Sequence, residues 1–269
     1  MVGDFEDEIL YHFDGSGEVV ETVSLGAKRM TYEQILCPNE TLLMNNSYLI
    51  EQFSIHTHET TPFTNKKNSM RTMLDLSGEL ALWYTGEEIV VFDFGSNTEV
   101  WRETVKCKKS KDPNFAYYCF GMLSPGQTKA VYRVTESEYV IVDLKSGEKM
   151  IISNDGWHPF FSPNDQIFSV GGKFYISQTG EETSNPFPFT VRQGLGYYDT
   201  FIVRSKDNLM AVQQERGNSP IELWDTSSGK LLTSIDDSFV VRQVNFAFTR
   251  SGLILHTDYG AMSIYSCSI

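Results

Sequence analysis

The stretch that decides the fold is Pro220–Ile235, which reads PIELWDTSSGKLLTSI. It predicts a short alternating strand that ends at Trp224-Asp225, then a polar turn, then a second strand over Leu231–Ile235. Tight turns favour glycine where φ is positive, and Asp or Ser side chains can accept hydrogen bonds from free backbone N–H groups. Asp225 and Gly229 stand where such a turn requires them. The stretch therefore predicts a β-hairpin.

The same hairpin recurs upstream, as VIVDLKSGEKMII at Val140–Ile152 and as IVVFDFGSNTEVW at Ile89–Trp101. A second pattern, an apolar residue followed by a short polar turn and a strand, precedes each hairpin. It occurs at Met73–Tyr84, Gly121–Val134, Pro159–Val170, Ile202–Gln214 and Phe246–Thr257, and more loosely at Gln34–Asn45. These six copies are about 40 residues apart, with four strands predicted in each, and this is the period of a β-propeller blade.

Long runs with the apolar spacing of a helix are absent from the sequence. A lone four-stranded sheet cannot cover both of its faces, whereas radial packing of several sheets buries them. The predicted fold is therefore all-β, a single β-propeller domain over residues 1–269 with four-stranded blades. Six blades are the preferred count and seven the alternative. The last copy ends after its third strand, so Glu18–Val23, within the segment 1–25, is predicted to close the last blade.

Several turns carry a resemblance to a known family. Trp224-Asp225 with Ser228-Gly229, and Asp143 with Ser146-Gly147, resemble WD-repeat propellers, as do the Ser-Pro turns at Ser124 and Ser162. The resemblance covers residues 31–269 and implies a non-catalytic interaction scaffold that serves as a subunit of a larger complex. The chain departs from the family pattern in having one Trp-Asp pair and no Gly-His dipeptide. Other propeller families remain an alternative.

Composition narrows the class of partner. The chain has 269 residues and a formal net charge of −13, which disfavours nucleic acid as a partner because phosphate backbones attract clustered lysine and arginine. We expect no membrane span, since no apolar stretch approaches the roughly 20 residues that a membrane helix needs. The four cysteines show no CxxC spacing, and no secretory signal is visible, so a cytoplasmic or nuclear protein with reduced thiols is expected.

Charged loops are the first candidate for partner binding. In WD-like propellers, the loops between second and third strands lie on the same face as the linkers between blades. The loops here read TGEE (Thr85–Glu88), TESE (Thr135–Glu138) and QERGNS (Gln214–Ser219), and one linker reads KCKKSKD. The candidate docking residues on this face are Glu87, Glu88, Lys106, Lys108, Lys109, Lys111, Glu136, Glu138 and Arg216. The alternative is that these charges only solvate the surface.

The longest irregular segment, Gly180–Thr200, is the second candidate. It places the aromatic residues Phe187, Phe189, Tyr197 and Tyr198 in a stretch rich in proline and glycine. Long loops are often functional, and exposed aromatic side chains are frequent interface anchors. The alternative is a fourth strand over Phe189–Arg192 whose neighbouring aromatic rings cap the sheet.

Catalytic, metal and cofactor sites are not predicted. The pair His56 and His58 supplies too few groups for a metal site, which needs three or four ligands. An enzyme that uses the central channel, as some propeller hydrolases do, is one alternative function. It would need histidine and carboxylate side chains on the first strands, which are chiefly apolar. Binding of anionic lipid or RNA by the lysine-bearing loops is another alternative.

Overall fold

The computed structural model describes most of the strands and turns of the chain. The residues described are 2–4, 9–13, 19–24, 34–37, 41–46, 49–54, 57, 59–62, 73–77, 79–84, 87–105, 120–192, 202–214, 219–235, 244–248, 252–257 and 262–266. The chain divides into two compact units. The first comprises Met1–Leu123 with Lys129–Lys149, and the second comprises Ser124–Thr128 with Met150–Ile269.

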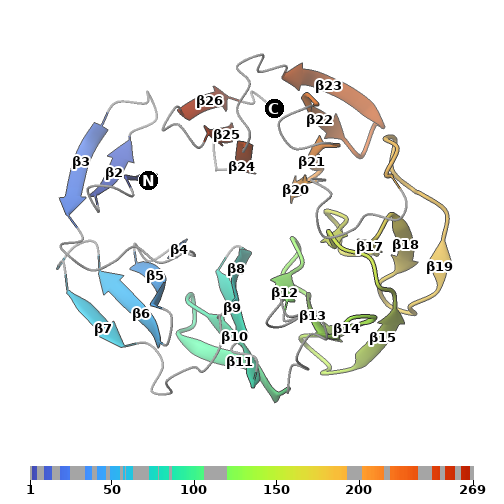
Figure 1. The fold of residues 1–269 in the computed structure, drawn as a ribbon, viewed down its shortest axis with the longest axis horizontal. Coiled ribbons are helices and arrows are strands. Elements are labelled where there is room, and N and C mark those ends of the chain that lie inside the picture. Colours follow the sequence, from blue (N-terminus) through green and yellow to red (C-terminus); the bar gives the residue numbers. More distant parts are fainter. Residues whose placement is uncertain are drawn as a thin grey trace. The chain divides into compact units, whose positions relative to one another are not determined.

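Within the described ranges the fold is all-β, as the sequence predicted. It contains 26 strands, which form seven antiparallel sheets, and no helix (Figure 1). In every sheet the strands lie in chain order, so each strand pairs with its neighbour in the sequence. This arrangement needs only short connections, and it agrees with the succession of hairpins that the sequence indicates.

The first unit begins with a three-stranded sheet of β1 (Val2–Asp4), β2 (Ile9–Phe13) and β3 (Val19–Ser24). A four-stranded sheet follows, made of β4 (Gln34–Cys37), β5 (Thr41–Asn46), β6 (Leu49–Ser54) and β7 (Thr60–Pro62). The next sheet holds β8 (Met73–Ser77), β9 (Leu80–Tyr84), β10 (Glu88–Asp93) and β11 (Thr98–Thr104). A further sheet holds β12 (Phe120–Leu123), β13 (Lys129–Thr135), β14 (Glu138–Asp143) and β15 (Lys149–Ser153), and β15 leads into the second unit.

The second unit continues the succession. One four-stranded sheet holds β16 (Phe160–Phe161), β17 (Ile167–Val170), β18 (Lys173–Ile176) and β19 (Glu182–Thr183). The next holds β20 (Ile202–Lys206), β21 (Leu209–Gln213), β22 (Ile221–Asp225) and β23 (Lys230–Ile235). The last described sheet has three strands, β24 (Val244–Phe248), β25 (Gly252–Thr257) and β26 (Met262–Ser266).

The N-terminal segment does not follow the sequence prediction. Glu18–Val23 was predicted to complete the last sheet, but Val19–Ser24 is β3 and pairs with β2 in a separate sheet. A hairpin between neighbouring segments closes a much shorter loop than a pairing between the two ends of the chain, and short loops cost less conformational entropy. Seven sheets are therefore present among the described residues, in place of six with a shared last sheet.

Burial differs between the strands of one sheet. Every residue of β9, which reads LALWY, and of β21, which reads LMAVQ, is buried. Continuous apolar runs of this kind are expected where a strand is covered on both faces. The fourth strands are more exposed, and on β23 the side chains of Leu231 and Leu232 are about half exposed. The second strands β9 and β21 are therefore the interior of their sheets, whereas the fourth strand β23 faces solvent.

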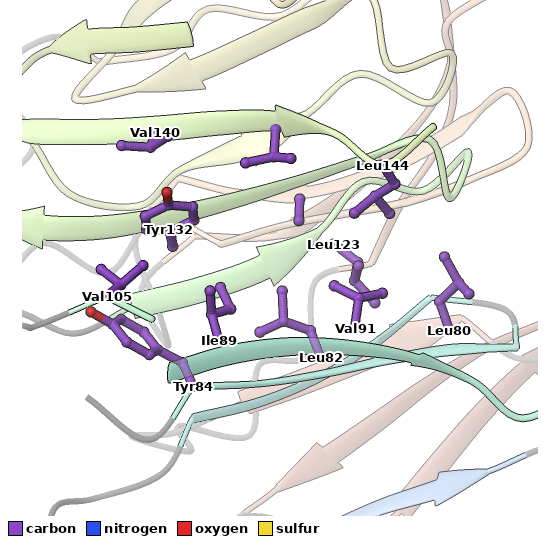
Figure 2. Close-up of a cluster of buried hydrophobic side chains, with 12 residues drawn as sticks. Leu80, Leu82, Tyr84, Ile89, Val91, Val105, Leu123, Tyr132, Val140 and Leu144 are labelled. Atoms are coloured by element: carbon purple, nitrogen blue, oxygen red, sulfur yellow. The ribbon is translucent and has the colours of Figure 1, made fainter. Parts of the chain in front are cut away.

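Each unit has a hydrophobic core between neighbouring sheets. In the first unit, Leu82, Tyr84 and Ile89 of one sheet pack with Leu123 and Tyr132 of the next (Figure 2). The first strands β4, β8 and β12 follow one another side by side in this unit, and β16, β20 and β24 do so in the second. In the second unit the core is built around phenylalanines and includes Met210 and Val212. These neighbouring sheets therefore pack against one another through their first strands and core side chains.

The turn predicted at Asp225 is confirmed. The Asp225 carboxylate accepts hydrogen bonds from the backbone N–H and hydroxyl of Ser227 at 2.9 Å and 2.6 Å, and from the Ser228 hydroxyl at 2.6 Å. Gly229 has a φ of 68°, which the turn requires. Asp93 and Asp143 accept the same kind of hydrogen bonds at the ends of β10 and β14. One turn chemistry thus recurs in three sheets.

Candidate functional site

The buried side chain of Arg133, which is 1% exposed, supports the loop between β13 and β14 through hydrogen bonds. Its Nε donates a hydrogen bond to the carbonyl oxygen of Thr135 at 3.0 Å, and its Nη2 donates to the carbonyl oxygen of Glu136. The guanidinium carbon lies 5.0 Å from the ring centroid of Tyr139, the geometry of a cation–π interaction. The guanidinium thereby supplies donors to two backbone carbonyls at the turn between β13 and β14.

Further hydrogen bonds within this loop are made by the hydroxyl of Thr135. The Thr135 hydroxyl donates to the Glu138 carboxylate at 3.1 Å and accepts from the backbone N–H of Ser137 at 3.3 Å. Glu138 is half-buried by this contact, whereas the Glu136 side chain is exposed. The loop is therefore a fixed backbone that displays Glu136 to solvent.

The loop between β21 and β22 also accepts a hydrogen bond from a buried polar side chain. The Gln213 side chain is 2% exposed, and its Nε2 donates a hydrogen bond to the carbonyl oxygen of Ser219 at 3.0 Å. The neighbouring Gln214 donates from its side chain to the carbonyl oxygen of Thr190 at 2.7 Å. A buried polar side chain at the end of the second strand therefore contacts the loop in this sheet as well.

The loop between β9 and β10 has its own set of contacts. The Glu88 carboxylate lies 2.7 Å from the Arg102 guanidinium, which also pairs with Glu99 at 2.6 Å. Hydrogen bonding to Glu99 and the charges of Glu88 and Glu99 raise the pKa of Arg102. The carbonyl oxygen of Glu87 accepts a hydrogen bond from the backbone N–H of Val105 at 2.8 Å. Two of the predicted docking acids lie in this stretch. The Glu88 side chain is half-buried in an ion pair, and the Glu87 side chain is exposed.

Tyr84, at the end of β9, is fully buried beside this loop. Its ring meets the ring of Tyr132 edge-on, with 6.4 Å between the centroids, and both rings can be followed in Figure 2. Burial raises the pKa of the Tyr84 hydroxyl, because the phenolate would be poorly solvated there. Tyr84 thus serves the core through its ring.

The structure of the aromatic segment differs from both interpretations of the sequence. The fourth strand of its sheet is β19 (Glu182–Thr183), and Phe189–Arg192 forms no strand. Phe189 is 4% exposed, so its ring is no surface anchor. It stacks on the half-buried Phe187 at 5.2 Å and meets Trp224 at 5.9 Å. These rings form a wedge between two sheets of the second unit.

Local hydrogen bonds shape this wedge. The Asn185 side chain donates to the carbonyl oxygen of Phe189 at 2.7 Å and accepts from the backbone N–H of Phe187 at 2.9 Å. Pro186 and Pro188 have no N–H group, so this stretch cannot supply a regular ladder of donors. The prolines and the Asn185 hydrogen bonds therefore keep residues 185–188 out of a strand ladder and hold the rings of Phe187 and Phe189 together.

Seven candidate docking residues lie outside the described part of the chain. They are Lys106, Lys108, Lys109, Lys111, Tyr197, Tyr198 and Arg216. The histidines His56 and His58 lie outside it as well. Their assignments remain predictions.

Sequence reasoning missed a polar contact between two neighbouring sheets of the first unit. The Tyr132 hydroxyl on β13 donates to the Glu103 carboxylate on β11 at 3.0 Å, and Lys149 forms an ion pair with the same carboxylate. Burial, together with the Glu103 charge, raises the pKa of Tyr132. No local pattern signals this contact, because its members stand on separate hairpins.

The described residues include no group of three or more His, Cys, Asp or Glu side chains placed to hold a metal ion. No helix long and apolar enough to cross a membrane occurs in the described part of the chain. A scan against protein-family models finds no matching family, and a search of curated proteins finds no similar sequence. The function is therefore inferred from the loops themselves.

Proposed function

We propose that this chain is a non-catalytic protein-binding scaffold, a subunit of a larger complex, that docks partners on the loops following its second strands. The observation that carries the proposal is the support of one loop by the Arg133 guanidinium, which binds the carbonyls of Thr135 and Glu136. A loop that is already ordered loses little conformational entropy when a partner binds. Such a loop is suited to recognition.

We further propose that the sheets are blades of a divergent WD-like β-propeller. The repeated antiparallel sheets, the Asp-capped turns at Asp93, Asp143 and Asp225, and the side-by-side first strands within each unit support this fold. The seven described sheets favour seven blades over six. Repeats of this kind are stable because each sheet buries its faces against its neighbours.

The charge of the loops favours a partner with a basic surface. Glu87 and Glu136 are exposed at the second-strand ends of two sheets in the first unit, and the chain carries a net charge of −13. Exposed charges of one sign raise association rates with an oppositely charged partner and give specificity more than affinity. Binding should therefore weaken as the ionic strength rises.

The test is purification of the tagged protein from its native cells, with comparison of three forms. The wild type is expected to bring along a defined set of proteins in near-equal amounts. The double variant Glu87→Lys/Glu136→Lys should lose them, because it reverses the exposed charges of the loops. The control Glu148→Lys changes an exposed acid in the turn at the other end of β14 and should keep them. A wild type that purifies alone as a stable monomer, or equal retention by all three forms, would contradict the proposal.

A further inference from the structure

We propose that the second-strand residue paired with the position four residues before the end of the third strand is a loop-positioning residue, and that Arg133 and Gln213 at this position use their buried side chains to hold the backbone that follows. The effect on partner recognition rests on the function proposed above. The effect on loop structure does not, since it follows from hydrogen bonds already present in the chain.

The strand register places the two residues at one equivalent position. Arg133 pairs with Tyr139, and Gln213 pairs with Ile221. Tyr139 and Ile221 each stand four residues before the aspartate that ends the third strand, Asp143 or Asp225. Tyr84, which pairs with Ile89, occupies the same position relative to Asp93.

The same register position carries a polar residue in two further sheets. Asn45 pairs with Ile50, four residues before Ser54, and His256 pairs with Met262, four residues before Ser266. The position is thus polar in sheets whose neighbouring second-strand residues are mainly apolar, as in LALWY and LMAVQ. A polar residue in such a run indicates a specific role.

One sheet breaks the pattern, and its loop explains why. In the sheet of β17 and β18 the equivalent residue is Val170, which pairs with Lys173. These strands are joined directly by Gly171 and Gly172, with φ values of 60° and 77°. A two-residue turn of this kind closes through its own backbone and needs no side chain below it. Measured between the paired residues, the intervening segment is longer in the other two sheets, with five residues between Arg133 and Tyr139 and seven between Gln213 and Ile221, and there the position is polar.

At Arg133 and Gln213 the chemistry of the position is the supply of donors to backbone carbonyls, whereas Tyr84 at the equivalent position fills the core with its ring. A backbone carbonyl that is turned away from water is costly without a donor. The arginine serves two carbonyls and the glutamine one. Exchanging the side chain would therefore exchange the loop conformation, so the position acts as a determinant of specificity.

Hydrogen–deuterium exchange on the purified protein, without a partner, tests the positioning role. Arg133→Met keeps the length and apolar stem but has no donor, and we expect exchange across residues 135–138 to rise roughly tenfold or more. The core strand residues 139–142 should keep their protection. The exchange rate in Arg133→Gln should lie between the rates in Arg133→Met and the wild type, since an amide can donate to one carbonyl. Lys149→Met, which removes a cation from β15 away from the loop, is the control and should leave the loop unchanged.

A second variant keeps the test informative if Arg133→Met fails to fold. Gln213→Met removes only a neutral donor and should raise exchange at Gln214 and Ser219, the described residues that follow β21. Unchanged exchange in both loops, or an equal rise throughout the sheet, would overturn the positioning role. The outcome of the charge-reversal experiment does not depend on the outcome of the exchange experiment, because the first measures partner binding and the second measures loop structure. A loosened loop with unaltered partner binding refutes the docking site alone, and loss of binding by the charge variant with unaltered loop exchange in Arg133→Met refutes positioning alone.

Discussion

The carboxylate of Asp165 accepts a hydrogen bond from the hydroxyl of Ser124 at 2.7 Å, and so joins two turns that belong to different sheets. The same carboxylate accepts from the backbone N–H of Gly126 at 2.8 Å and from the Thr128 hydroxyl at 2.6 Å. Asp165 is 5% exposed, and these donors balance its burial. The turn at Ser124 and the turn at Asp165, both in the second unit, are therefore joined through one carboxylate.

Replacement of Asp165 by alanine should lower the free energy of unfolding by about 2–4 kcal/mol, since several hydrogen bonds to one charged acceptor are lost. Urea unfolding followed by tryptophan fluorescence measures this change. The control is Asp207→Ala. Asp165 and Asp207 have similar φ values of 59° and 52°, so both variants carry the same backbone cost, but Asp207 is exposed. Equal destabilisation by the two variants would show that the carboxylate does not join the turns.

Acid should weaken the turn at Asp225. Hydrogen bonds from the hydroxyls of Ser227 and Ser228 lower the pKa of Asp225 to about 2. The pKa is lower in the folded than in the unfolded state, so the stabilisation is complete above the unfolded value of about 3.9 and is lost as the pH falls toward 2. Asp225→Asn should therefore flatten the dependence of the melting temperature on pH between about 4 and 2.

The cause of this low pKa can be tested directly. The double variant Ser227→Ala/Ser228→Ala removes both hydroxyl donors and should return the pKa of Asp225 toward about 3.9, as measured by NMR of the carboxyl carbon. An unchanged titration would mean that the serine hydroxyls do not hold the carboxylate.

Gly156 and Gly171 approach each other closely in the second unit. A Cβ added to Gly156 would lie 2.3 Å from the Cα of Gly171, a backbone atom that cannot move aside cheaply. Gly156→Ala should therefore cost about 3 kcal/mol or more of unfolding free energy. The control is Gly147→Ala, where a Cβ would meet nothing within 4 Å and only the positive φ of 73° opposes the change, at about 1–2 kcal/mol. Chemical denaturation of both variants compares the two costs.

The hairpins were predictable from the sequence because their causes are local. Alternating apolar residues, Asp225 and Gly229 lie within a few positions of one another, and each acts on its own strand or turn. A strand over Phe189–Arg192 was the alternative considered for the aromatic segment, and the structure has none there. The hydrogen bonds of Asn185 and the ring contacts of Phe189 that fix this segment have no simple sequence pattern.

Contacts between sheets were not predictable in the same way. The hydrogen bond between Asp165 and Ser124 joins residues 41 positions apart, and nothing in either turn identifies the other as its partner. The support of the loops by Arg133 left a signal that was readable in principle. Aligning the copies on Asp143 and Asp225 places a polar residue, Arg133 or Gln213, after the apolar run of the second strand. Its role became clear only from the hydrogen bonds.

The aromatic wedge gives a prediction that separates packing from partner binding. Phe189→Ala should lower the free energy of unfolding by about 3–5 kcal/mol, because a buried ring is removed from contact with Phe187 and Trp224. The neighbouring Pro188 is exposed, so Pro188→Ala should lower the free energy of unfolding by less than about 1 kcal/mol. Thermal unfolding measures stability, and partner retention at a temperature where all forms are folded measures binding. An anchor would show the opposite result, with stability unchanged and binding lost, because truncation of an exposed ring removes contacts only in the complex.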